Sequence, residues 1–333
     1  MDRDYVFSRR IYQSLDSSGD TLQVAGKEGG CNPMKIAYLV MAHKNPQLLK
    51  RAIRTLSSED SSFFIHIDRK SNIEQFSGIG GENVLFSEKR IPVYWGEFSQ
   101  VEAIILLLRQ AMERPDGYNY FVLLSGSDYP LRSGQYIHAF LEESRGLDFI
   151  DLVKMPAPGK PISRINTLRF QSHMPIRRFA VRALAKAGMA QRDYRKYLGS
   201  LEPYSGGTWW CLTRDACQYI LDFIEQNPHV TTFFQDTFAP DEALFHTILG
   251  NSPFASRIRR GLFYTDWSAN GAHPAMINDQ QVAFFEAQQK IHLRDIYGSG
   301  EVLFARKFSD DSLDLLQRID SMIKRTDLNV QRQ

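Results

Sequence analysis

Cysteine is scarce in this chain. Its 333 residues include only three cysteines, Cys31, Cys211 and Cys217, at irregular spacing. That number is too small for a disulfide framework, and the spacing does not match a zinc site. We therefore expect a protein of a reducing compartment, with the cytoplasm as the simplest setting.

Long hydrophobic runs are also missing near the start of the chain. The first 33 residues are polar and contain Gly26, Gly29 and Gly30. They have neither the apolar core of a secretory signal nor the run of ~20 apolar residues that a membrane-spanning helix needs. We predict that residues 1–33 form a flexible tail and that the folded part begins at Met34.

The chain carries little net charge, since 40 lysine and arginine residues are nearly matched by 38 aspartate and glutamate residues. A net charge of +2 gives no general attraction to nucleic acid, which we do not expect as a partner. The local exception is the stretch 177–196, where seven basic residues stand against the single acid Asp193. This stretch could contact an anionic membrane peripherally, or form a solvated basic flap.

Short apolar runs alternate with helical patterns in the first half of the chain. Apolar runs between turn signals predict strands at 36–42, 63–67, 84–86 and 120–124, and helical periodicity predicts helices at 46–56 and 99–112. Strands alternating with helices favour an α/β fold with a mostly parallel, Rossmann-like sheet flanked by helices. Ligands of such sheets bind beyond the carboxyl ends of the strands, where Asp68 and Asp128 are expected.

The segment Pro240-Asp241-Glu242 and the residues after it predict an amphipathic helix that starts at the proline and has Glu242 in its first turn. Proline suits the first position of a helix, and the helix dipole at that end favours an ionised acid. If the chain is an enzyme, Glu242 is the candidate base, and His246 one turn later could orient it or simply satisfy a helix neighbour. The alternative is an ordinary helix cap.

Four segments of unusual composition occur in a characteristic order: Tyr94–Ser99, Leu123–Leu131, Gly206–Trp210 and Phe304–Phe308. In this order they resemble the core-2/I-branching glycosyltransferases and peptide O-xylosyltransferases, glycosyltransferase family 14. The resemblance extends over roughly 34–325 and includes Met41–His43, His66–Asp68, Asp266–Trp267 and His273–Pro274. Animal relatives are usually cysteine-rich Golgi proteins, so the low cysteine content suggests a bacterial-type member that builds a surface polysaccharide.

The resemblance implies a GT-A-type fold and an inverting transfer of N-acetylglucosamine or xylose. The donor would be a UDP-sugar and the acceptor a hydroxyl of a glycan or glycoconjugate, with Glu242 as the base. The proline- and glycine-containing segment Met155–Pro161 is typical of a loop. We predict that it joins a nucleotide-sugar half, 34–150, to an acceptor and catalytic half, 151–333, within one catalytic domain.

The resemblance also assigns the donor contacts. Asp68 would bind uracil or ribose, and Arg306 and Lys307 would contact the diphosphate. Many GT-A enzymes use an Asp-x-Asp triplet to hold a metal ion there, yet the only such triplet in this chain is Asp2-Arg3-Asp4 in the tail. Basic side chains can neutralise a leaving diphosphate instead, so we expect no metal cofactor.

Contacts with the donor sugar or the acceptor are less well defined. Small residues and a carboxylate can approach sugar hydroxyls, and tryptophan rings can stack on sugar faces, although a tryptophan is often simply core. In relatives, the position of Thr208 sometimes holds an acid. The candidates for this role are Trp95, Glu97, Ser127, Asp128, Thr208, Trp209 and Trp267.

Two other functions are compatible with the same scaffold. One is a catalytically silent protein that binds a nucleotide or a carbohydrate, and the intact segments around Glu242 and Arg306 argue against it. The other is a nucleotidyltransferase, which would be expected to have an early glycine-rich phosphate loop. The segment Met41–Pro46 is not such a loop.

Overall fold

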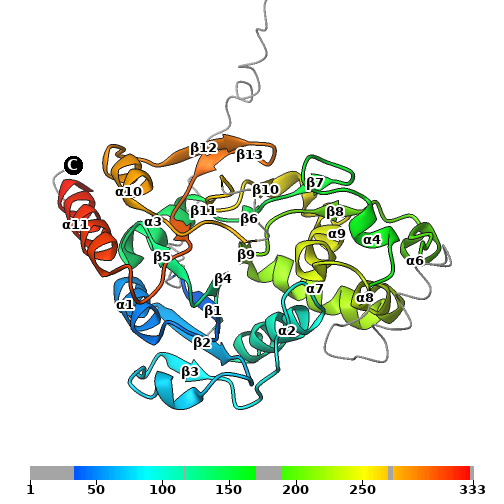
Figure 1. Cartoon of the computed structure of the whole chain (residues 1–333), viewed down its shortest axis with the longest axis horizontal. Coiled ribbons are helices and arrows are strands. Elements are labelled where there is room, and N and C mark those ends of the chain that lie inside the picture. The colour runs from blue at the N-terminus through cyan, green and yellow to red at the C-terminus, as the bar shows by residue number, and fades with distance from the viewer. Residues whose placement is uncertain (1–33, 116, 170–189, 269–272, 331–333) are drawn as a thin grey trace, which may run out of the picture. The chain divides into compact units, whose positions relative to one another are not determined.

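The computed structural model describes residues 34–115, 117–169, 190–268 and 273–330, and a seven-stranded sheet lies at its centre (Figure 1). The strand order is β10-β6-β9-β4-β1-β2-β3. These strands are β1 (Ile36–Ala42), β2 (Ser61–Ile67), β3 (Val84–Phe86), β4 (Tyr120–Ser125), β6 (Asp148–Ile150), β9 (Trp210–Thr213) and β10 (Ile258–Arg259).

The sheet is mostly parallel. β1 pairs in parallel with β2 and β4, β2 with β3, and β6 with β10. β9 pairs antiparallel with both β4 and β6, so it runs against the other strands of this sheet. The predicted α/β fold with a mostly parallel sheet is confirmed. Its GT-A type stays an implication of the resemblance.

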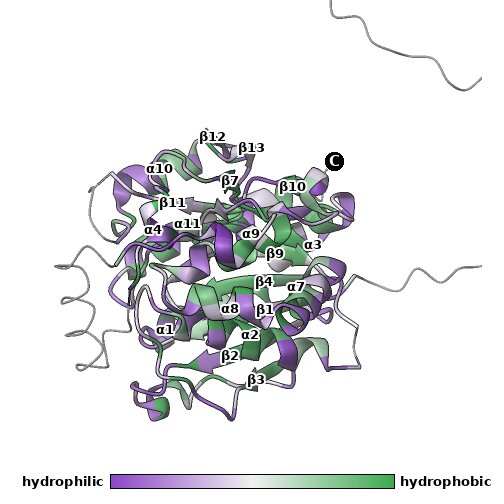
Figure 2. Ribbon diagram, turned by 90° about the vertical axis from the view of Figure 1, so that its right-hand side faces the viewer, coloured by the Kyte–Doolittle hydropathy of each residue, from purple (hydrophilic) through white to green (hydrophobic). Residues whose placement is uncertain are grey.

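Helices cover both faces of the sheet because its central strands are apolar on both sides. Every residue of β1 is buried, and successive side chains enter opposite layers of the core. One layer is packed by α2 (Ser99–Met112) and α7 (Arg214–Gln226), and the other by α1 (Pro46–Leu56) and α3 (Gly134–Glu143). Figure 2 shows the hydrophobic colour gathered in the middle of the molecule and the hydrophilic colour toward its periphery.

A second, three-stranded sheet adjoins the carboxyl end of the central one. Its strands are β5 (Asp128–Pro130), β11 (Phe263–Thr265) and β14 (Phe304–Arg306), in the order β11-β14-β5. β14 and β5 are antiparallel, and their register places Arg306 opposite Asp128. A third apolar cluster joins this sheet to α10 (Asp279–Glu286) and α11 (Leu313–Val330).

The remaining elements are short. Two antiparallel pairs are formed by β7 (Val153–Lys154) with β8 (Tyr204–Ser205), and by the consecutive strands β12 (His292–Asp295) and β13 (Gly298–Glu301). The other helices and 3-10 turns are η1 (Ile73–Phe76), α4 (Ser163–Asn166), α6 (Arg195–Leu198), α8 (Pro228–Gln235), η2 (Pro240–Glu242), α9 (Leu244–Gly250) and η3 (Ala255–Arg257).

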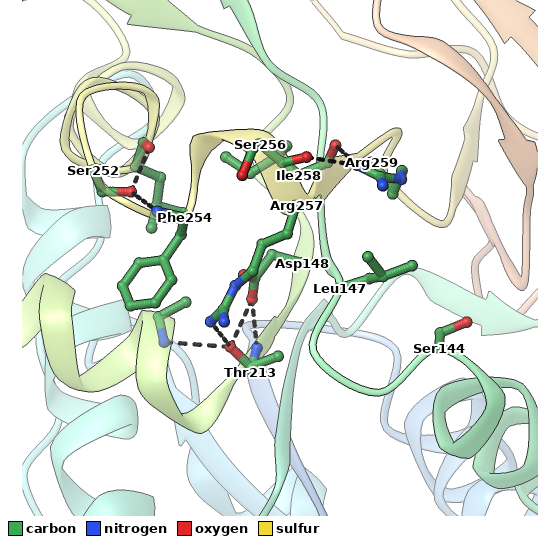
Figure 3. Close-up of polar contacts among 12 residues, drawn as sticks. Ser144, Leu147, Asp148, Thr213, Ser252, Phe254, Ser256, Arg257, Ile258 and Arg259 are labelled. Carbon is green, nitrogen blue, oxygen red and sulfur yellow. Dashed lines mark hydrogen bonds and ion pairs between the residues drawn. The ribbon is translucent and has the colours of Figure 1, made fainter. Parts of the chain in front are cut away.

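A buried carboxylate holds the far end of the central sheet together (Figure 3). Asp148 of β6 is fully buried and accepts hydrogen bonds from the backbone N–H and the hydroxyl of Thr213, at 2.8 and 2.9 Å. Arg257 lies 2.9 Å from the same carboxylate and donates to the Thr213 hydroxyl at 3.1 Å. Since Thr213 also caps α7, Asp148 links β6, β9, α7 and the turn before β10.

The prediction that Glu242 lies in the first turn of an α-helix is wrong. Pro240 does begin a helical turn, but this turn is a 3-10 helix that ends at Glu242. Ala243, with φ −136° and ψ −42°, departs from helical geometry, and α9 begins only at Leu244. Glu242 therefore stands in the junction between two helical segments.

The basic stretch 177–196 is described only from residue 190 onward, and the predicted tail 1–33 lies outside the described residues. In the described part, Arg192 donates to the Phe233 carbonyl at 2.9 Å and lies 4.1 Å from the centroid of that ring. A membrane contact through 177–196 stays a prediction. No helix in the described ranges is long and apolar enough to cross a membrane.

Candidate functional site

A large cavity of about 1190 Å³ lies at the carboxyl ends of the parallel strands. Turns that follow β1, β2 and β4 form one side of it, as expected for an open α/β sheet. Segments from the second half of the chain form the other side. The predicted site residues that line it are Asp68, Trp95, Ser127, Thr208, Trp209, Glu242, Trp267, Arg306 and Lys307.

Two positive side chains hold Glu242 in the cavity wall. Lys160 Nζ and Arg164 Nη1 each donate to Glu242 Oε2 at 2.6 Å. Burial acts to raise the pKa of Glu242, but the charges and hydrogen bonds of these two cations outweigh it and lower the pKa below its usual range. Glu242 is thus an ionised carboxylate at neutral pH, and both hydrogen bonds that its carboxylate accepts from the described residues end on Oε2.

His246 does not orient Glu242, contrary to the prediction. Its fully buried ring forms a hydrogen bond through Nε2 to the Gly207 carbonyl at 3.0 Å. Because a carbonyl only accepts, the proton of the neutral ring is on Nε2. Burial, together with the charge of Lys160, lowers the pKa of His246 to about 3, so the ring is neutral. Glu242 is instead oriented by Lys160 and Arg164, and Lys160 also donates to the Gly206 carbonyl.

Asp241, the neighbour of Glu242, has a different setting. It is buried, and its Oδ2 accepts from the Thr208 hydroxyl at 2.7 Å and from the Gln100 amide at 3.1 Å. Burial and the adjacent charge of Glu242 raise the pKa of Asp241. The pKa of Asp241 is therefore raised and that of Glu242 is lowered, so Glu242 is the more acidic of the two carboxyl groups. Thr208 contacts the Asp241 member of this pair.

Arg306 is fixed by two contacts in the cavity wall. Its guanidinium lies 4.4 Å from the centroid of the Trp209 ring, and its Nε is 3.2 Å from Asp128 Oδ1. Asp128 is in turn held by the backbone N–H and hydroxyl of Ser125, at 2.7 and 2.6 Å. Asp128 is buried and does not line the cavity, so its place corrects the prediction of a sugar contact. It supports Arg306 instead.

Lys307 brings a second cation to the same wall. It is half-buried, and burial followed by the charges of Arg306 and Lys44 lowers the pKa of Lys307. Lys44, from the turn after β1, also lines the cavity. Positive groups therefore converge here, and Asp128 is the acid that partly compensates them. This wall is suited to bind an anion.

Asp68 closes the end of the cavity near β2. Its Oδ1 accepts from the backbone N–H of Lys70 at 2.9 Å, and Lys70 Nζ lies 3.2 Å from its Oδ2. His66 accepts from the Ile91 N–H at Nε2, at 2.8 Å, and burial lowers the pKa of His66 to about 4. The imidazole is therefore neutral, and this end offers polar groups suited to an uncharged heterocycle.

Aromatic side chains form the rim of the cavity. Trp95 and Trp267 are 58% and 53% exposed, and Trp95 packs edge-on against His273 at 5.0 Å. Trp210, in contrast, is fully buried in the core. Glu97 is buried and does not line the cavity, which corrects its predicted place.

The sequence did not reveal Lys160, Arg164, Lys44 or Asp241 as parts of this site. Lys160 and Arg164 meet Glu242 across 82 and 78 positions of the chain, and such contacts leave no local pattern. Lys160 stands in the segment interpreted only as a linking loop. Within the described ranges, no group of three or more His, Cys, Asp or Glu side chains is placed to hold a metal ion. Metal independence stays a prediction.

Comparison with known proteins gives one family. The model of the Core-2/I-Branching enzyme family matches residues 36–289, well over half of the chain. Mouse xylosyltransferase 2 is 27% identical over 316 residues, and dog xylosyltransferase 1 is 26% identical over 249 residues. These matches cover 87% and 71% of this chain, but only 34% and 24% of the relatives, so the chain spans about a third or less of their length.

Among solved structures, apo mouse xyloside xylosyltransferase 1 aligns with a TM-score of 0.35 and 11% identity, over 81% of this chain and 97% of that one. The family match includes the turns after β1, β2 and β4, and it includes Glu242. The chain belongs to the Core-2/I-branching enzyme family.

Proposed function

We propose that this protein is an inverting glycosyltransferase that needs no metal ion. It transfers N-acetylglucosamine or xylose from a UDP-sugar to a hydroxyl of a glycan or glycoconjugate. The observation that carries the proposal is a single cavity whose walls hold an ionised carboxylate, Glu242, and a pair of cations, Arg306 and Lys307. Family membership supports the same reaction class.

The donor would lie along the carboxyl ends of β1, β2 and β4. Asp68 and the neutral His66 line the end suited to uracil and ribose, and Ser127, which also lines the cavity, would lie near the sugar. Arg306 and Lys307 would bind the diphosphate through charge-assisted hydrogen bonds, with Asp128 and Trp209 keeping the guanidinium in place. These cations stabilise the negative charge that develops on the leaving UDP.

Glu242 would act as the general base. It removes the proton from the acceptor hydroxyl while the hydroxyl oxygen forms a bond to the anomeric carbon. On the opposite face, the bond from the anomeric carbon to the β-phosphate oxygen breaks, and the electron pair leaves with UDP. Attack opposite to departure inverts the anomeric configuration. Lys160 and Arg164 keep the base ionised and leave one carboxylate oxygen for the substrate proton.

The acceptor would enter across the aromatic rim. Trp95 and Trp267 expose wide ring surfaces on which a sugar can stack, and Trp209 lies deeper, beside Arg306. Thr208 donates to Asp241, the neighbour of Glu242, so it would lie near the position that the attacking hydroxyl takes. We also propose the cytoplasm as the site of action, with peripheral membrane contact through 177–196.

A donor screen tests the proposal. The protein is incubated with UDP-N-acetylglucosamine, UDP-xylose and other sugar nucleotides, with and without candidate glycan acceptors, and released UDP is measured. We expect UDP release with one of these two donors, increased by an acceptor. Binding of UDP-sugar without release under any acceptor would instead indicate a catalytically silent binding protein.

A further inference from the structure

The turn after β1 is hydrogen-bonded to the turn after β4 and to the segment that carries Arg306 and Lys307. Asn45 in this turn is buried and has a left-handed backbone, φ 60° and ψ 55°, which asparagine tolerates better than most residues. Its amide nitrogen lies 3.1 Å from the Ser127 hydroxyl and 3.4 Å from the Phe308 carbonyl. A single side chain therefore ties the turn that carries Lys44 to the residue that follows Lys307.

The backbone of the same region is closely packed. A Cβ placed on Gly126 would lie 2.8 Å from the Ala42 Cβ and 3.3 Å from the Lys44 carbonyl oxygen, so only glycine fits. The backbone N–H of Phe308 donates to the Ser127 carbonyl at 2.9 Å. The turns after β1, β4 and β14 thus form one rigid unit at the cavity.

Lys44 projects from this unit with no acid paired to it in the described part of the chain. It is exposed, lines the cavity, and has no ion-pair partner among the residues that the structure describes. Its charge acts on Lys307 and on His43 in the direction that lowers the pKa of each. Holding like charges together costs free energy in the unliganded protein, and a bound anion would offset that cost.

We propose that Lys44 is a third cation of the diphosphate site, and that Asn45 is the positioning residue that holds it beside Lys307. This assignment rests on the proposed function, because the anion it recognises is the diphosphate of the UDP-sugar. Lys44 reaches the site from the first half of the chain, whereas Arg306 and Lys307 reach it from the end of the chain. The diphosphate would be enclosed from two directions.

Calorimetric titration with UDP and with uridine tests the assignment. Lys44→Ala should weaken UDP binding by roughly tenfold, since a charge-assisted contact is lost, and should leave uridine binding unchanged. The matched control is Lys50→Ala, an exposed lysine of α1 that does not line the cavity. It should bind both ligands like the unchanged protein.

Asn45→Gly separates positioning from general stability. Glycine keeps the left-handed backbone but removes the amide contacts, so UDP binding should weaken while uridine binding persists. A purely structural residue would weaken both ligands together or neither. If Asn45→Gly does not fold, Lys44→Ala still decides the assignment of Lys44, and Asn45→Asp, which keeps the shape but loses the amide donor, decides that of Asn45.

The UDP-binding results separate a failure of the Lys44 assignment from a failure of the proposed function. No UDP binding by the unchanged protein would overturn both. Normal UDP binding by Lys44→Ala, together with weakened binding by Arg306→Ala, would overturn the assignment of Lys44 alone. Normal UDP binding by both Asn45 variants would remove only the positioning role.

Discussion

At the scale of single residues, the proposed reaction depends on Glu242. We expect Glu242→Gln to lower the transfer rate by about a hundred- to ten-thousand-fold, the usual loss when a general base is removed. UDP affinity should change little, because Arg306 and Lys307 are untouched. Steady-state UDP release and calorimetric UDP titration measure the two effects. Glu202→Gln is the control, since Glu202 is in an exposed ion pair with Lys154.

Near-normal turnover of Glu242→Gln with a lower melting temperature would make Glu242 a structural residue. In that case Lys160 and Arg164 would simply neutralise a buried charge. A fall in turnover in both Glu242→Gln and Glu202→Gln would mean that the assay reports stability.

The cations around Glu242 predict a pH effect. A base works when deprotonated, and the lowered pKa of Glu242 keeps it deprotonated into the acidic range. Lys160→Met removes one of the two charges that lower this pKa, so the pKa rises and the acidic limb of the kcat/KM profile moves to higher pH. A profile whose acidic limb stays in place or moves to lower pH would contradict this assignment.

Individual site residues were predictable only where a short motif carries them. Arg306, Lys307 and Glu242 stand in such motifs, and the structure places all three on one cavity. Asp128 also stands in a motif, but burial and the contacts to Ser125 and Arg306 decide its place, and these depend on the fold. Lys160 acquires its partner only when distant segments meet.

At the scale of elements, the contacts of Asp148 with Thr213 and Arg257 stabilise the packing of β6, β9 and α7. Asp148→Asn keeps the shape but removes the charge that pairs with Arg257, which should destabilise the fold by about 3 kcal/mol. Urea unfolding followed by tryptophan fluorescence gives this value. Asp222→Asn, an exposed position on α7, should stay near the unchanged protein.

Equal stability of Asp148→Asn and the unchanged protein would show that the neighbouring strands hold this end without the carboxylate. A change in the slope of unfolding free energy against urea would point to an altered unfolded state instead.

The elements of the first half were predictable because their signals are long. α1 and α2 have the predicted bounds, and β1 is a run of seven buried apolar residues. The second half contains strands of two to four residues, which are too short for a periodic pattern. The start of α9 was misplaced because proline marks the first position of a 3-10 turn as well as that of an α-helix.

At the scale of the whole molecule, the cavity connects segments from both ends of the described chain, so a donor ligand should stabilise it as a unit. UDP at about a hundred times its Kd should add roughly 2.7 kcal/mol to the unfolding free energy. Arg306→Ala should lose much of this gain at the same UDP concentration, because its affinity is lower. Thermal melting with increasing UDP measures both proteins, and equal midpoint shifts would remove Arg306 from the donor site.

The most direct measurement of the central claim follows the reaction in excess EDTA. With the donor and acceptor found in the screen, we expect UDP release to continue at its original rate and the product to have the inverted anomeric configuration by NMR. The reason is that Arg306 and Lys307 neutralise the leaving diphosphate without a metal ion. Activity that disappears with EDTA and returns only with Mn²⁺ or Mg²⁺, or a product of retained configuration, would contradict the account.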